Sequence, residues 1–182
     1  MKTLNKEFPF FISKALGEHA IDFAVKSVQP MIKRGWIKRA DVHIVVLAPQ
    51  LVTDANRKYP GKYSLEPELL CEKSFGIKEK WEHPYDEIAQ CKALQKWHGR
   101  NTNDNEATPA HLLFINDTPF WGAVKMEGLV AGCSGVQQWY DKMMCRLTLA
   151  HLIAAARERF EQYRKLYPKF DFIKDIEFSR NA

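Results

Sequence analysis

The chain has 182 residues, a hydrophobic fraction of 46%, a charged fraction of 27% and a formal net charge of +5. This length suits a single domain spanning residues 1–182, and the composition is that of an ordinary globular protein, so a disordered chain is not expected. The 27 basic residues are scattered along the sequence, so the charge does not favour a nucleic-acid partner. No apolar run reaches the ~18 residues of a membrane span, and the N-terminal apolar run is too short for a secretory signal. We therefore expect a cytoplasmic protein without a membrane partner.

Apolar residues recur at three-and-four spacing between residues 18 and 34, which predicts an amphipathic helix. Pro30 is expected to kink this helix or shorten its last turn, and Gly35 to end it. Residues 42–48 are almost continuously apolar and rich in β-branched types, which predicts a central strand covered on both faces. We expect His43, inside this strand, to be a core histidine with a satisfied hydrogen bond.

Residues 49–84 contain several Pro and Gly residues and no sustained periodicity. They are expected to form a long excursion with short helical pieces, a kind of segment that often carries function. A second helix is predicted from residue 84 or 85 to residue 98, with acidic residues in its first turn and Gly99 at its end.

Three short apolar strands are predicted next, over residues 111–115, 122–126 and 129–133, with Glu127-Gly128 as a hairpin turn. A long helix is predicted from residue 136 to about residue 167. The C-terminal tail, residues 168–182, contains an alternating segment that predicts an edge strand. The element order predicts an α+β fold: an antiparallel-rich sheet with a three-stranded meander, flanked by helices.

The cysteines do not indicate a metal or redox motif. No two of Cys71, Cys91, Cys133 and Cys145 form a C-x-x-C pair, and no H-x-x-x-H or H-E-x-x-H run occurs. We therefore predict no metal site. Cys133 and Cys145 lie among apolar residues and are expected to be buried thiols.

Two segments carry candidate chemistry. After the second helix, His98, Arg100 and Thr102 offer an imidazole, a guanidinium and a hydroxyl. Arg100 could pair bidentately with a carboxylate or phosphate, although basic residues also suit the negative end of a helix dipole. Further along, Ser134 and Gly135 precede the long helix, whose first N–H groups can hold an anion. The alternative there is a tight turn with Ser134 as a helix cap.

Together these segments resemble the GlcG/HbpS-like family, also described as haem-degrading or PduO C-terminal-like domains. The family's Ile-Ala-x-x-Lys-Ala helix is matched by residues 88–93, and its Gly-Arg-Pro-Thr-like turn by residues 99–102, with Asn in place of Pro. Its Gly-x-Ser-Gly hairpin with an acidic residue in the next helix is matched by residues 128–135 with Asp141. The resemblance is strongest over residues 87–141 and implies a profilin-like α/β sandwich, frequent homo-oligomers and, in some members, haem binding.

The resemblance implies a small-molecule-binding protein whose ligand is haem or an organic anion. The expected ligand-binding residues are Lys92, His98, Arg100, Thr102, Ser134, Gly135 and Asp141. Haem needs an axial ligand, and the candidates are His83, His98 and His111. Two other functions remain open. One is an enzyme acting on a small carboxylated metabolite, with Lys92 and Arg100 holding the anion and His98 or Asp141 as general acid or base. The other is a non-catalytic interaction module that forms oligomers.

Overall fold

The computed structural model describes residues 4–54, 62–63, 66–101, 107–171 and 173. Its main feature is a four-stranded antiparallel sheet in the order β5-β2-β7-β6, where β2 is Val42–Ala48, β5 Glu68–Phe75, β6 Val124–Met126 and β7 Leu129–Ser134. A smaller sheet in the order β1-β3-β4 contains Leu4–Glu7 (β1), Leu51–Asp54 (β3) and Lys62–Tyr63 (β4). The helices are Lys14–Lys33 (α1), Tyr85–Trp97 (α2) and Gln138–Leu166 (α3), with short 3₁₀ turns at Lys78–Lys80 and Ala110–Leu112. The predicted α+β class is confirmed.

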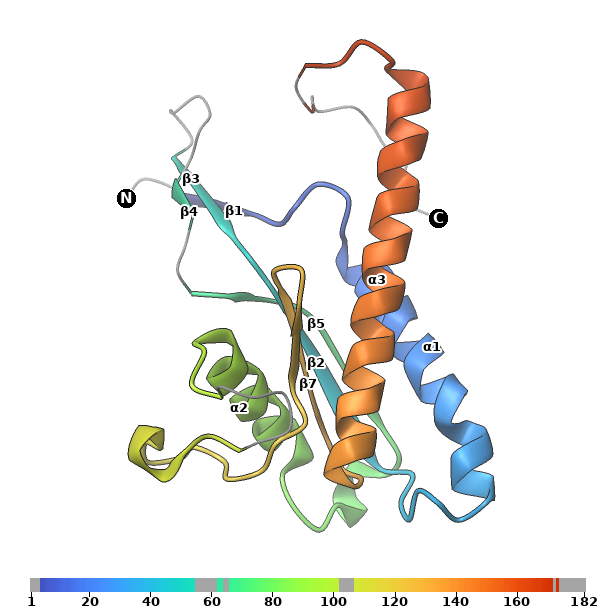
Figure 1. Ribbon diagram of the computed structural model, residues 1–182, viewed down its shortest axis with the longest axis vertical. Coiled ribbons are helices and arrows are strands. Elements are labelled where there is room, and N and C mark those ends of the chain that lie inside the picture. The colour runs from blue at the N-terminus through green and yellow to red at the C-terminus, as the bar shows by residue number, and fades with distance from the viewer. Residues whose placement is uncertain (1–3, 55–61, 64–65, 102–106, 172, 174–182) are drawn as a thin grey trace.

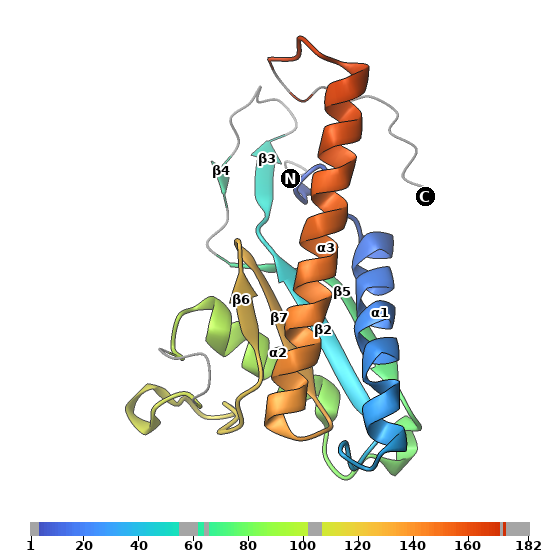
Figure 2. The ribbon, with the colours of Figure 1, turned by 45° about the vertical axis from the view of Figure 1, so that its right-hand side comes forward.

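Helices cover both faces of the larger sheet (Figure 1). α1 and α3 lie side by side on one face, and α2 lies on the other (Figure 2). Strand β2 is buried along its whole length, with Ile44 and Val46 in the core shared with α1 and α3. Val45 and Leu47 point the other way, into the smaller core under α2. This confirms the prediction of a central strand, because only a strand covered on both faces carries a continuous apolar run.

Helix α1 begins at the Ser13 cap, whose Oγ accepts a hydrogen bond from the Leu16 N–H at 3.3 Å. The helix continues past Pro30 to Lys33, so Pro30 does not end the regular structure. Pro30 is exposed and lies in the last turn of α1. Its missing N–H removes one intrahelical hydrogen bond. Gly35, with φ of 73°, lies just beyond the end of the helix as predicted.

The largest departure from the sequence predictions is strand β5. Residues 49–84 were expected to hold short helical pieces, but β5 pairs with β2 from Phe75 opposite Val42 to Glu68 opposite Ala48. A register shift leaves adjacent Leu70 and Cys71 both buried. This irregularity breaks the period-two pattern by which a strand is recognised.

The predicted strand over residues 111–115 is wrong. The chain there forms the 3₁₀ turn and then an irregular segment in which Phe114 and Ile115 are 72% and 93% exposed. Backbone groups that a sheet would use are instead bonded to side chains: Arg100 donates to the Leu112 carbonyl, and the Phe114 N–H donates to Asp117. The expected three-stranded meander is therefore reduced to the β6–β7 hairpin.

The hairpin itself is confirmed. Strands β6 and β7 pair from Val124 opposite Ala131 to Met126 opposite Leu129. Glu127 and Gly128 have φ values of 46° and 86°, and two consecutive positive φ angles are typical of a type I′ turn.

Helix α3 confirms the predicted long helix and extends well beyond the larger sheet (Figure 1). Its distal half is covered by an aromatic cluster, in which Tyr163 has ring centroids of Phe11 and Phe170 at 5.7 and 5.1 Å. Of the tail, residues 172 and 174–182 lie outside the described part of the chain, so the predicted edge strand falls largely outside it. None of the described helices combines the length and the apolar content needed to cross a bilayer.

All four cysteines are free thiols, and Cys133 and Cys145 are buried as predicted. His43 is buried on β2 as predicted, and its Nδ1 lies 2.8 Å from the Ser74 Oγ on β5. Its other ring nitrogen, Nε2, is buried without a hydrogen-bond partner among the described residues and lies 3.4 Å from a Glu72 carboxylate oxygen.

Candidate functional site

A buried ion pair joins the two segments that carry the sequence motifs. The Lys92 Nζ on α2 donates to the Asp141 Oδ2 on α3 and to the Cys133 carbonyl on β7, each at 2.8 Å. The two charged side chains are only 2% and 1% exposed. Strand β6 pairs with β7 only as far as Ala131, so the Lys92 ammonium satisfies a β7 carbonyl beyond the end of its neighbouring strand.

The close approach of α2 to β7 explains the small residues of both motifs. A Cβ on Gly132 would lie 2.2 Å from the Ala89 carbonyl oxygen and 2.8 Å from the Ala93 Cβ. Only a glycine on the strand facing alanines on the helix allows this distance. The resulting contact brings Lys92, on the turn of α2 between the two alanines, to the edge of the sheet.

Asp141 lies in the first turn of α3, and its Oδ1 accepts a hydrogen bond from the Val136 N–H at 3.3 Å. Burial raises the pKa of Asp141 to about 6, and the Lys92 ammonium opposes this increase. Asp141 is therefore the anion at the positive end of this helix. Ser134 was considered as a cap for this helix, but it is the last residue of β7, and the residue at the N-cap position is Gln137.

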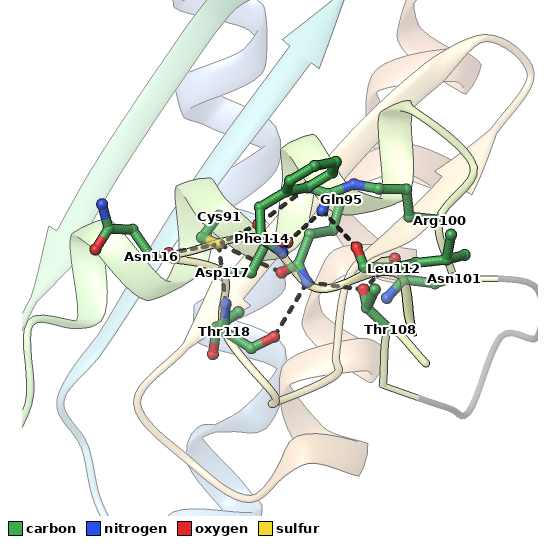
Figure 3. A network of polar contacts seen from close by, with 10 residues as sticks. All are labelled: Cys91, Gln95, Arg100, Asn101, Thr108, Leu112, Phe114, Asn116, Asp117 and Thr118. Atoms are coloured by element: carbon green, nitrogen blue, oxygen red, sulfur yellow. Dashed lines mark hydrogen bonds and ion pairs between the residues drawn. The ribbon is translucent and has the colours of Figure 1, made fainter. Parts of the chain in front are cut away.

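The other side of α2 faces the irregular segment after the 3₁₀ turn (Figure 3). The Gln95 Nε2 donates to the Thr108 Oγ1 at 2.7 Å and to the Thr118 carbonyl at 3.1 Å. One turn earlier, the Cys91 Sγ accepts a hydrogen bond from the Thr118 N–H at 3.2 Å, and its thiol donates to the Gln95 Oε1 at 3.3 Å. Burial raises the pKa of the Cys91 thiol. These contacts hold residues 108 and 118 against α2.

Arg100 fixes the same segment from the C-terminal end of α2. Its guanidinium donates to both carboxylate oxygens of Asp117, with a distance of 3.0 Å between Nη2 and Oδ1, and to the Leu112 carbonyl at 3.1 Å. Asp117 also accepts the Phe114 N–H at 2.7 Å. The hydrogen bonds from Arg100 hold the pKa of Asp117 below its usual value. The Phe114 ring lies over the guanidinium, 5.2 Å from its carbon to the ring centroid.

A hollow of about 300 Å³ lies between α2 and this segment. Its walls combine the apolar side chains of Leu94 and Ile115 with polar and charged groups. The lining residues are Glu87, Gln90, Cys91, Leu94, Arg100, Ile115, Asn116 and Asp117. A volume of this size lies at the lower end of the range for small-molecule sites.

The site residues predicted from the sequence lie at separate locations in the structure. Lys92 and Asp141 form the buried pair, and Ser134 and Gly135 are buried where β7 ends. A Cβ on Gly135 would lie 2.2 Å from the Asp41 carbonyl oxygen, so this turn is filled by the chain itself.

Arg100 alone of the expected ligand-binding residues lines the hollow, within the described part of the chain. His98 is exposed at the end of α2, with its Nε2 3.4 Å from a Glu66 carboxylate oxygen. His83 and His111 are exposed, and none of the three histidines lines the hollow. Thr102 lies outside the described residues.

Cys91 and Asp117 are site residues that were not predicted from the sequence. Asp117 stands in an Asn-Asp-Thr-Pro run, whose residue types are typical of a turn, and an aspartate in such a turn often bonds the backbone near it. Cys91 carries no comparable local signal, because its partners are more than 20 residues away in sequence, apart from Gln95.

Within the described ranges, no group of three or more His, Cys, Asp or Glu side chains is arranged to hold a metal ion. Comparison of the chain with models of protein families, with curated proteins and with solved structures found no match. Function is therefore inferred from the geometry of the site.

Proposed function

We propose that this chain is a small-molecule-binding protein whose ligand is an organic anion held in the hollow between α2 and residues 113–118. The observation that carries the proposal is that the Arg100 guanidinium, which lines the hollow, has N–H donors left over after its bonds to the described residues. Within the part of the chain that the structure describes, its bonds to Asp117 and Leu112 use three of its five N–H groups. The two that remain can donate to a ligand carboxylate, while Leu94 and Ile115 contact its apolar part.

Membership of the GlcG/HbpS-like family, with its profilin-like sandwich, is part of this proposal. Its support is the contact between the two motif segments: Lys92 bonds Asp141, and Gly132 packs against Ala89 and Ala93. The contact thus explains why each motif position carries its residue type: the charged residues pair with each other, and the small residues allow the close approach. The exposed Phe114 and Ile115 support homo-oligomer formation, because large apolar side chains at the surface favour association.

Haem is a second candidate ligand, because its propionates are carboxylates that Arg100 could bind. His98 and His111 are exposed and stand two residues and one residue in sequence from Arg100 and Leu112, which are bonded to each other. His83 precedes the other end of α2, about 20 Å away along a helix of this length. An axial ligand would therefore come from His98 or His111.

The alternative of a metabolite enzyme has less support. Lys92 and Asp141 are bonded to each other and buried, so neither side chain reaches the hollow. Of the residues considered for acid–base catalysis, His98 alone is exposed, among those the structure describes.

Binding is tested with haemin, followed by its Soret band, and with a panel of small mono- and dicarboxylates, followed by calorimetry. Gln90→Trp places a bulky ring in the hollow without removing a bond of the Arg100 network, and Ala154→Trp, on the exposed face of α3, is the matched control. We expect Gln90→Trp and Arg100→Gln to weaken binding at least about tenfold and the control to bind normally. For haemin, His98→Ala or His111→Ala should abolish the shifted band and His83→Ala should not. The proposal fails if no probe binds, or if Gln90→Trp binds as well as the wild type.

A further inference from the structure

Two histidines contact each other where α1 packs against α3. The ring centroids of His19 on α1 and His151 on α3 are 5.3 Å apart, with an angle of 48° between the ring planes. Phe23, one turn beyond His19, stacks on the His151 ring at 4.7 Å and 21°. The two helices lie side by side (Figure 2), so both rings are held by regular structure.

These two imidazoles differ from those of His43 and His98. His43 is bonded to Ser74, and His98 lies beside Glu66. Among the described residues, none forms a hydrogen bond or ion pair with the ring nitrogens of His19 or His151. His19 is exposed and His151 is half-buried, so solvent reaches the pair while the packing of Phe23 restricts the inner ring.

The spacing of the rings suits two ligands on one metal ion. Imidazole nitrogen binds first-row metals at about 2.0–2.1 Å, and two rings at a tetrahedral angle then have centroids about 5 Å apart. The observed 5.3 Å matches this value. Neutral imidazole is a ligand for Zn²⁺, Ni²⁺ and Cu²⁺, whereas Ca²⁺ and Mg²⁺ require oxygen.

We propose that His19 and His151 form a two-imidazole site for a divalent first-row transition-metal ion, with water as the remaining ligands. The site is separate from the hollow beside α2, which lies on the opposite face of the sheet (Figure 1). It has two protein ligands, in keeping with the absence of a three-residue cluster among the described residues, so the ion exchanges readily. Because the ion joins α1 to α3, it binds the folded chain and not the unfolded one, and it stabilises the packing of these helices.

The test uses the full-length protein without a histidine tag, treated with a chelator and then titrated with ZnCl₂, NiCl₂ or CuCl₂. At a metal concentration of about 100 Kd we expect Tm to rise by roughly 5–10 °C. His19→Gln and His151→Gln should each lose this rise and weaken binding in calorimetry at least about tenfold. His83→Gln removes an exposed histidine elsewhere and should retain both effects.

Electron paramagnetic resonance of the Cu²⁺ form provides a second readout, in which two imidazole nitrogens should couple to the ion. If His151→Gln does not fold, the exposed His19→Gln variant decides the question alone. The proposal is overturned if His19→Gln binds metal as tightly as the wild type, or if the spectrum shows one coupled nitrogen or none.

Discussion

Replacing Lys92 by Met should lower the free energy of unfolding by about 3–5 kcal/mol, because it leaves a buried carboxylate without its counter-ion. Asp141 is 1% exposed, and without Lys92 it retains the Val136 N–H at 3.3 Å and the Cys133 thiol at 3.5 Å. Asp141→Asn leaves the Lys92 ammonium with the Cys133 carbonyl alone. That change should also cost stability, but less than Lys92→Met, because burial already disfavours the ionised form of Asp141.

The double variant Lys92→Met/Asp141→Asn isolates the interaction energy between the two side chains from their interactions with the rest of the protein. It contains no buried charge at this place, and the Asn oxygen can still accept the Val136 N–H. We expect its cost to be about 1–3 kcal/mol smaller than the sum of the two single costs, as is found for residues in direct contact.

The assay is urea unfolding of the wild type, both single variants and the double variant, followed by tryptophan fluorescence and far-UV circular dichroism. Lys165→Met, at the exposed end of α3, is the control and should change stability by less than about 0.5 kcal/mol. The reasoning is refuted if the double variant loses as much unfolding free energy as the two single variants together, or if a single variant loses less than about 1 kcal/mol. The ion pair would then make no specific contribution to stability.

Three further predictions follow from the same region. Gly132→Ala should destabilise the protein by at least about 1–3 kcal/mol, because the added Cβ meets the Ala89 carbonyl oxygen at 2.2 Å; unchanged urea unfolding would contradict this. Arg100→Gln should cost about 1–3 kcal/mol by removing charge-assisted bonds to Asp117, and hydrogen exchange should speed up at residues 112–118 more than in the strands of the sheet. For Asp141, the folded pKa of about 6 lies above the ordinary value of 3.8. Its contribution to stability should therefore be present below about pH 4 and lost as the pH rises through about 6. The stability difference between the wild type and Asp141→Asn should decrease over that range, and a difference independent of pH would show that the carboxyl titrates elsewhere.

Local periodicity was sufficient to predict an element where that element buries one regular set of side chains. The apolar stripe of α1, the continuous apolar run of β2 and the Glu127-Gly128 turn each carry their signal within a few residues, and the structure confirms all three. The order of the predicted elements likewise identified the α+β class, because that class depends on which element types follow one another along the chain.

Only the tertiary structure decided the pairings between distant segments. Strand β5 is recognisable through its bonds to β2, since its register shift disturbs the local pattern. Residues 111–115 have the composition of a strand but lack a strand partner, because Arg100 and Asp117 take their backbone groups. The bond between Lys92 and Asp141 spans 49 positions in sequence. The residue types at both ends were noticed beforehand, but their burial together, away from the hollow that Arg100 lines, follows from how α2 and α3 pack on the sheet.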